Sequence, residues 1–262
     1  MKKLVLVKLG GSLITDKTKR ECLRKRTLAR LARELKDAGK KVKLIVGHGG
    51  GSFPHFPAKK YRVNEGIIDE DSIKGFCLTH DSAARLNRLV VKAFLKAGIN
   101  AVGLQPSACM LCKDGKIVKS FLEPIEEMLK NDIMPVPYGD AALDLKKGIT
   151  IISTEQVLSE LALKLKAKRI VVAGIVPGVF TADPFKDKNA ELIPRITREN
   201  FSEIRKMLSG SHGVDVTGGM LSKVEEMLTL ADKGVKSQIV GAEKPGVLKK
   251  ALLGKNVGTI IE

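Results

Sequence analysis

The chain has 262 residues, of which 44% are hydrophobic and 29% are charged, enough for a sizeable core in one or two closely joined domains. No apolar run approaches the roughly 20 residues of a membrane span, and the apolar N-terminal stretch is too short for a signal peptide, so we expect a cytoplasmic protein. The net charge of +17 suits nucleic acid or small polyanions, but aromatic residues make up only 4% and the basic residues are spread along the chain, which argues against nucleic acid.

The first half of the chain alternates predicted strands and helices. Apolar runs at 3–9 and 42–46 predict strands, and the helix between them begins after an N-cap at Thr27 and ends at Gly39. This strand–helix–strand order indicates a parallel sheet. Further on we expect a helix from Asp81 to Gly98, a hairpin turn at Asp114-Gly115, strands at 102–104, 108–111, 117–119 and 133–136, and a short helix at 123–129.

The second half repeats this style. The predicted strands are 149–152, 169–173, 238–240 and 257–261, and the predicted helices are 155–165, 200–208 and one opening at Asp215. No linker separates the halves, so we expect them to share one continuous sheet.

The pattern of the four cysteines does not indicate a metal site or a redox site. Cys109 and Cys112 form a lone C-x-x-C, whereas a zinc site needs a second pair or suitably spaced histidines. Positions three apart on the strand expected here point to opposite faces. We therefore expect thiols without a metal or redox role, and no bound metal from side-chain ligands.

Polar clusters follow the predicted strands, and ligands bind at strand ends in open α/β sheets. The clusters are Lys8-Leu-Gly-Gly-Ser12 with Lys17, the loop from Gly47 to His55, Ser153-Thr-Glu155, and Thr217-Gly-Gly-Met-Leu-Ser-Lys223 at a helix start.

The loop after the second strand indicates phosphate binding. Glycines let the backbone approach a ligand closely, successive amides form an anion-binding concavity, and His55 is able to donate to an anion near neutral pH. A flexible glycine turn without a ligand is the alternative. Because the clusters supply cations and backbone amides, with no catalytic triad, paired acids or P-loop, they favour phosphoryl transfer.

The ordered motifs resemble those of isopentenyl phosphate kinases, a branch of the amino acid kinase superfamily. The motifs are Lys8-Leu-Gly-Gly-Ser12, Ile14-Thr-Asp-Lys17, His48-Gly-Gly-Gly-Ser-Phe-Pro-His55, Pro135-Val-Pro-Tyr-Gly-Asp140, and Asp215-Val-Thr-Gly-Gly-Met220 with Lys223. The resemblance implies an α/β fold, a three-layer αβα sandwich around a mainly parallel open sheet. It implies one domain over 1–262, with an N-terminal lobe of about 1–145 for the phosphate acceptor and a C-terminal lobe of about 146–262 for ATP.

The resemblance also implies a function: an ATP- and Mg²⁺-dependent homodimeric kinase that converts isopentenyl phosphate to isopentenyl diphosphate in isoprenoid biosynthesis by the mevalonate pathway. Its implied catalytic residues are Lys8, Lys17, His55 and Glu155, with Lys17 stabilising the transition state. Its implied acceptor residues are Gly50, His55 and Thr154. Its implied nucleotide residues are Lys8, Gly10, Gly11, Ser12, Gly51, Phe180, Asp183, Pro184, Gly219 and Lys223.

Several positions depart from the family pattern. Pro54 and Thr154 stand where the family has glycine, and Ile175 and Pro177 stand where it has aspartates. Two alternatives therefore stay open: a kinase for another small phosphomonoester or phosphonate, and a nucleotide-binding sensor with weak catalysis. His48 is expected to orient its loop. Four apolar residues suit either a prenyl pocket or the core: Phe53, Phe56, Ile73 and Phe76.

Overall fold

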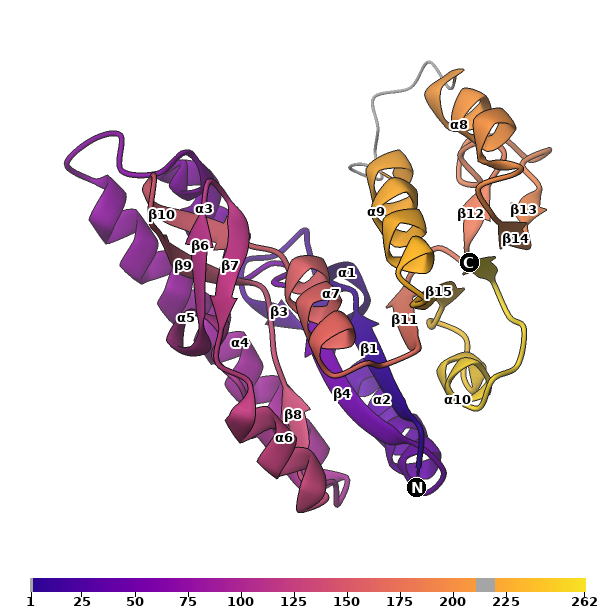
Figure 1. Ribbon diagram of the computed structural model, residues 1–262, viewed down its shortest axis with the longest axis horizontal. Helices are drawn as coiled ribbons and strands as arrows, with labels where there is room; N and C mark the ends of the chain where they lie inside the picture. The colour runs from indigo at the N-terminus through magenta and orange to yellow at the C-terminus, as the bar shows by residue number, and fades with distance from the viewer. Residues whose placement is uncertain (1, 211–219) are drawn as a thin grey trace.

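Figure 1 shows the computed structural model, which describes residues 2–210 and 220–262. Its main sheet has six strands in the order β14-β16-β15-β11-β1-β4. The four strands from β15 to β4 are parallel, and β1 from the first half pairs directly with β11 from the second. The halves therefore share one central sheet, as predicted. The bounds are β1 Leu4–Leu9, β4 Lys43–His48, β11 Arg169–Gly174, β14 Arg195–Ile196, β15 Lys236–Gly241 and β16 Thr259–Ile261.

Helices cover both faces of this sheet, because its strands are apolar on both sides. Val5, Val7 and Leu9 of β1 face a core built with α2 (Lys25–Gly39), α4 (Ser72–Lys96) and α10 (Val247–Leu252). Leu6 of β1 faces the opposite core, which includes α7 (Thr154–Lys164) and α6 (Glu123–Lys130). A third cluster lies under α8 (Phe201–Gly210) and α9 (Met220–Asp232). The result is the predicted three-layer αβα sandwich.

A second, four-stranded sheet lies beside the first and is largely antiparallel. Its order is β10-β9-β6-β7, and Asp114-Gly115 forms the predicted hairpin turn between β6 and β7. In Figure 1 this sheet, with α3 (His55–Lys60) and one end of α4, forms an arm at the upper left. The bounds are β6 Met110–Lys113, β7 Lys116–Ser120, β9 Asp140–Asp144 and β10 Gly148–Ile152. This second sheet was not predicted from the sequence.

Several element boundaries differ from prediction. The helix expected from Asp81 begins at Ser72, and α2 begins two residues before Thr27. Residues 106–109 form a short helix, so the strand expected at 108–111 begins only at Met110; Cys109 ends a helix while Cys112 lies in β6. The predicted start of the last long helix, at Asp215, lies outside the described residues. The remaining elements are α1 Gly11–Ile14, β2 Thr15–Asp16, β3 Cys22–Leu23, η1 Val63–Glu65, β5 Ala101–Gly103, α5 Pro106–Cys109, β8 Met134–Val136, β12 Val179–Phe180 and β13 Leu192–Ile193.

None of the helices in these two ranges combines the length and apolar character that a bilayer-crossing helix requires.

Candidate active site

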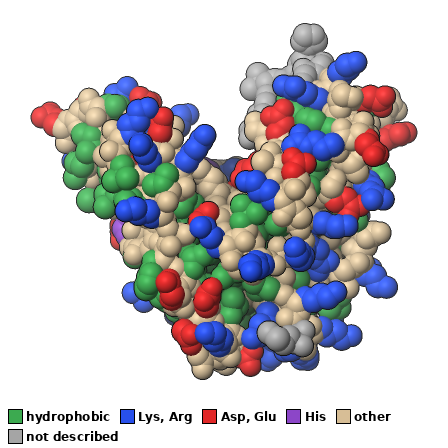
Figure 2. Space-filling model, in the orientation of Figure 1, with side chains coloured by type: hydrophobic (Ala, Val, Ile, Leu, Met, Phe, Trp, Pro, Cys, Tyr) green, Lys and Arg blue, Asp and Glu red, His purple; other side chains and the backbone are tan. Residues whose placement is uncertain are grey.

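A cavity of about 630 Å³ lies at the carboxyl ends of β1, β4 and β11. Figure 2 shows the molecule hollowed between the part that carries α3 and β10 and the part that carries α8 and α9. Most of the predicted site residues line this one cavity although they come from distant parts of the sequence. They are Lys8, Gly10, Gly11, Ser12, Lys17, Gly50, Gly51, His55, Thr154, Glu155, Asp183 and Lys223.

Two of the predicted nucleotide residues that the structure describes, Phe180 and Pro184, do not line this cavity. Phe180 lies in β12 and Pro184 follows Asp183, but the aromatic ring that reaches the cavity from this segment belongs to Phe185. Gly219 lies outside the described residues.

The two glycine loops are packed backbone against backbone. Gly10 N donates to Ala173 O at 2.8 Å, and Gly49 N donates to Leu9 O at 2.9 Å. A Cβ on Gly11 would lie 2.5 Å from the amide nitrogen of Gly51, closer than real Cβ atoms come to any neighbour. Gly51 itself has a φ of 56°, which favours glycine. The loops therefore form a single backbone-lined wall.

Lys8 and Glu155 form an ion pair on the cavity wall, with side chains 12% and 18% exposed. Lys8 projects from β1, and Glu155 lies in the first turn of α7. Burial alone would raise the pKa of Glu155, but attraction and hydrogen bonding to Lys8, with help from the charge of Lys223, hold that pKa below its usual value. The carboxylate is therefore ionised and holds the ammonium of Lys8 in the cavity.

A second carboxyl, which the motif analysis missed, lies near this pair. Glu226 of α9 has a pKa raised first by burial and then by the charge of Glu155. Its partner is Ser159, whose hydroxyl lies 3.4 Å from Glu226 Oε1.

Lys17 and His55 both line the cavity and are close enough for the charge of Lys17 to act on the ring of His55. Both are exposed, Lys17 directly after β2 and His55 as the first residue of α3. Neighbouring protein atoms still remove part of the water around the ring, and this desolvation lowers the pKa of His55; the charges of Lys17 and Lys8 lower it further. Without a ligand the His55 ring therefore holds a proton weakly. An anion bound between His55 and Lys17 would raise the pKa of the ring again.

His48 lies behind the loop and does not line the cavity. It is buried, its ring stacks on Tyr138 at 5.7 Å between centroids, and Asn87 Nδ2 lies 3.1 Å from its Nε2. Because that amide nitrogen is a donor, Nε2 accepts and Nδ1 donates to Gly49 O. Burial lowers the pKa of His48 to about 4, so the ring is neutral and holds the loop in place.

Thr154, at the position where a glycine was expected, is tied to the same loop. Its buried hydroxyl group donates to His48 O at 2.7 Å. The hydroxyl proton of Thr154 is therefore already used in a hydrogen bond to the backbone. The Pro54 ring packs against Gly50 so closely that a Cβ on Gly50 would lie 2.3 Å from Pro54 Cγ. Both departures from the family pattern thus shape the loop that carries Gly50.

The four candidates for a prenyl pocket do not line this cavity. Phe53 belongs to the main core, Phe76 packs with Val63, Ala141 and Ile149, and Ile73 is exposed. Phe56 lines a neighbouring cavity with Lys59 and Lys60. The apolar residues that line the cavity itself include Ala58, Ile151 and Ile152.

Asp140 also lines the cavity, although it was quoted within a motif without a role. Its Oδ1 lies 3.0 Å from His80 Nδ1, and this hydrogen bond raises the pKa of His80. Within 2–210 and 220–262, no three His, Cys, Asp or Glu side chains converge as metal ligands.

Comparison with known proteins identifies the family of this chain. The amino acid kinase family model matches residues 3–241. The isopentenyl phosphate kinase of Methanothermobacter thermautotrophicus is 37% identical and the match covers 97% of both chains; that of Methanocaldococcus jannaschii is 35% identical over 99% of this chain and 98% of the relative. A solved isopentenyl phosphate kinase structure matches with a TM-score of 0.85 and 34% identity over 99% of this chain and 100% of that one. The UMP kinase of Ureaplasma parvum shares the fold. It matches with a TM-score of 0.68 and 16% identity over 100% of this chain and 99% of that one.

Proposed function

The chain belongs to the amino acid kinase family, and from this premise we propose that it is a kinase that transfers the γ-phosphoryl group of ATP to isopentenyl phosphate, giving isopentenyl diphosphate and ADP. The observation that carries the proposal is the full-length match to isopentenyl phosphate kinases, combined with a single cavity that contains Lys8, Lys17, His55 and Glu155. These relatives give no support to the phosphonate kinase or to the nucleotide sensor.

The chemistry of this cavity supports such a transfer. An oxygen of the acceptor phosphate attacks the γ-phosphorus, and the bond to the bridging oxygen of ADP breaks. The acceptor oxygen is already ionised, so no base has to remove a proton. Bringing two anions to about 4 Å costs about 4 kcal/mol per pair of unit charges at an effective dielectric constant near 20. Lysines placed between the anions offset that repulsion.

We assign the following roles. Lys8, held by Glu155, and Lys17 contact the transferring phosphoryl group, and Lys17 stabilises its charge in the transition state. Gly50 and His55 hold the phosphate of the acceptor. Gly10, Gly11, Ser12, Gly51, Asp183 and Lys223 bind the phosphates and nearby groups of ATP.

The remaining expectations belong to the same proposal. The lobe of about 1–145 takes the acceptor and the lobe of about 146–262 takes ATP. Mg²⁺ enters with the phosphates of ATP, which suits a cation that keeps few protein ligands and uses substrate oxygens. The enzyme acts in the cytoplasm as a homodimer and feeds isoprenoid synthesis.

The test is a panel of acceptors assayed with ATP and Mg²⁺. ADP release and ³¹P NMR of the product are measured with isopentenyl phosphate, UMP and N-acetylglutamate, the last two chosen because other relatives are named uridylate kinase and acetylglutamate kinase. We expect a diphosphate product with isopentenyl phosphate and little turnover of the others. Faster turnover of UMP or N-acetylglutamate would overturn the proposal.

A further inference from the structure

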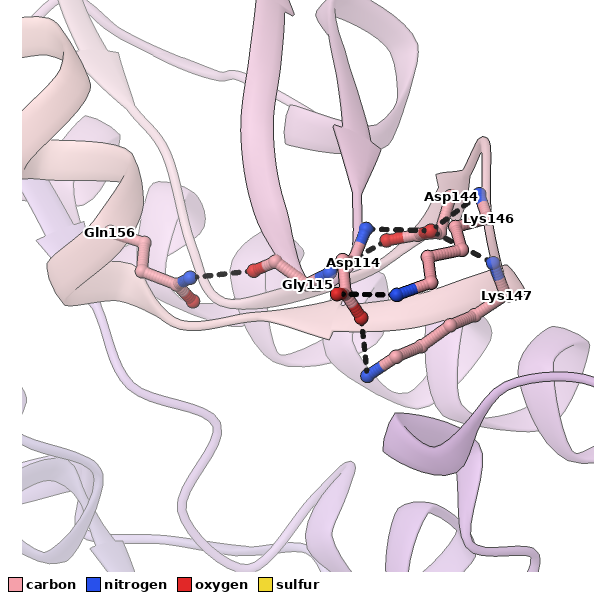
Figure 3. A network of polar contacts seen from close by, with 6 residues as sticks. All are labelled: Asp114, Gly115, Asp144, Lys146, Lys147 and Gln156. Carbon is pink, nitrogen blue, oxygen red and sulfur yellow. Dashed lines mark hydrogen bonds and ion pairs between the residues drawn. The ribbon is translucent and has the colours of Figure 1, made fainter.

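The turn of the β6–β7 hairpin is held rigidly by one carboxylate. Asp144, buried at the end of β9, accepts hydrogen bonds from the backbone amides of Asp114 (3.0 Å), Gly115 (2.8 Å), Lys146 (2.9 Å) and Lys147 (3.0 Å), as Figure 3 shows. These bonds outweigh the effect of burial and lower the pKa of Asp144 to about 2. The turn therefore has a fixed position relative to β9.

Gln156 joins this turn to α7. Its Nε2 donates to Gly115 O at 2.9 Å, and its Oε1 accepts from Ser153 N at 2.8 Å. The Ser153 hydroxyl in turn accepts from Gln156 N at 3.0 Å, which completes a capping box. One side-chain amide thus caps the start of α7 and bonds to the hairpin turn at the same time.

The residues next to Gln156 reach into the active site. Thr154 is bonded to the carbonyl of His48, and Glu155 is paired with Lys8. Three consecutive residues in the first turn of α7 are therefore fixed to three different elements: β4, β1 and the hairpin. A shift of the hairpin relative to α7 moves the backbone of Glu155, because Gln156 follows it directly.

The four-stranded sheet also forms the acceptor side of the cavity. Asp140 at the start of β9 and Ile151 and Ile152 at the end of β10 line it. The same sheet therefore touches the cavity at one point and Gln156 at another. We propose that Gln156 is a positioning residue that couples the acceptor-side sheet, through the Gly115 turn, to the Lys8–Glu155 pair. The inference rests on the proposed function for its link to turnover.

The decisive variant is Gln156→Glu. A glutamate keeps an oxygen for Ser153 N, so the capping box survives, but it loses the donor to Gly115 O and faces that carbonyl with a like partial charge. We expect kcat to fall about tenfold, because a small misplacement of a reacting group has effects of this size, while KM for ATP changes less than twofold. Gln238→Glu is the matched control, since Gln238 Nε2 donates to the carbonyls of Lys255 and Val257 away from this network.

Two further measurements separate positioning from loss of folding. Asp144→Asn weakens the turn from its other side, so its effect on log kcat should be less than additive with that of Gln156→Glu if both act through the turn. The titration of Glu155, followed by ¹³C NMR of its labelled carboxyl group, should shift upward in Asp144→Asn, a variant that removes a negative charge and so would by electrostatics alone lower this pKa, and should stay unchanged in Gln238→Glu.

The outcomes are distinguishable. An unchanged kcat in Gln156→Glu together with an unchanged Glu155 titration in Asp144→Asn, or full additivity of the two variants on log kcat, would overturn the inference while the proposed function stands. If the wild type does not phosphorylate isopentenyl phosphate but the Glu155 titration still shifts, the proposed function fails and the coupling stands.

Discussion

Lys8 and Glu155 lie 147 positions apart in the sequence and form an ion pair on the wall of the cavity. Lys8 comes from β1 of the six-stranded sheet, and Glu155 comes from α7, the helix that follows the second sheet. The ion pair therefore links β1 to the start of the helix that leaves the second sheet.

Removing the charge of Glu155 should impair catalysis more than binding. In Glu155→Gln, Lys8 loses its ionic partner and gains freedom to leave the reactive position, so kcat should fall about 100-fold with little change in KM for ATP. Glu160→Gln on the same helix is the control, because Glu160 accepts a hydrogen bond from the hydroxyl of Ser120 and does not line the cavity. Equal losses in the two variants would contradict the assignment. Initial rates of ADP release provide the measurement.

Lys17 lies in a run of charged residues, and its neighbour tests whether position or charge matters. Lys17 lines the cavity whereas Lys19, two residues on, does not. Lys17→Met should lower kcat by about 100- to 1,000-fold, since it removes a charge from the transferring group, and Lys19→Met should change it less than twofold. Similar kinetics for both variants would show that Lys17 is ordinary surface.

Acceptor binding should take up a proton at His55. The pKa of the free ring is lowered by desolvation and by Lys17 and Lys8, and a bound phosphate raises it again. Between those two pKa values the complex holds one more proton than the free enzyme, so affinity falls as pH rises through the pKa of the complex. Calorimetry in buffers of different ionisation enthalpy measures this uptake.

His55→Gln should abolish the uptake that belongs to the protein, and His80→Gln should retain it, because His80 bonds to Asp140. Turnover should likewise fall far more in His55→Ala than in His80→Ala. A proton uptake that persists in His55→Gln would assign it to the acceptor phosphate alone.

Gly50→Ala should damage the acceptor site without unfolding the protein. The added Cβ would lie 2.3 Å from Pro54 Cγ and 2.9 Å from its Cδ, and the closed proline ring has little freedom to move away from it. Overpacking of this kind costs about 1–3 kcal/mol, so KM for isopentenyl phosphate should rise about tenfold or more. Gly39→Ala at the end of α2, where the nearest atom is 3.8 Å away, should leave the kinetics intact.

The strands of the central sheet and the strand-end clusters were predictable because they carry local signals. β1, β4, β11 and β15 are short apolar runs, and each glycine loop follows one of them directly. The topology then brings the ends of parallel strands to one edge. The predicted association of Lys8, His55 and Glu155 follows from that rule without any knowledge of their contacts.

Other features were missed because their signals conflict or are purely tertiary. α3 contains Pro57 and only six residues, which argues against a helix in isolation, and β9 begins inside a Tyr138-Gly-Asp140 turn signal. The capping box of Ser153 and Gln156 was readable as a serine followed three residues later by a glutamine. Its bond to Gly115 was not readable, because 41 residues separate the two.

The close contact of Gly11 with Gly51 limits which substitutions evolution accepts in the two glycine loops. A side chain at either position would push both loops apart, so neither loop tolerates independent variation. Ala58, Asp140 and Ile151 line the same hollow from elements that are not locked in this way. A new preference for the organic part of the substrate would therefore arise by substitution of these three lining residues, while the two glycine loops stay unchanged.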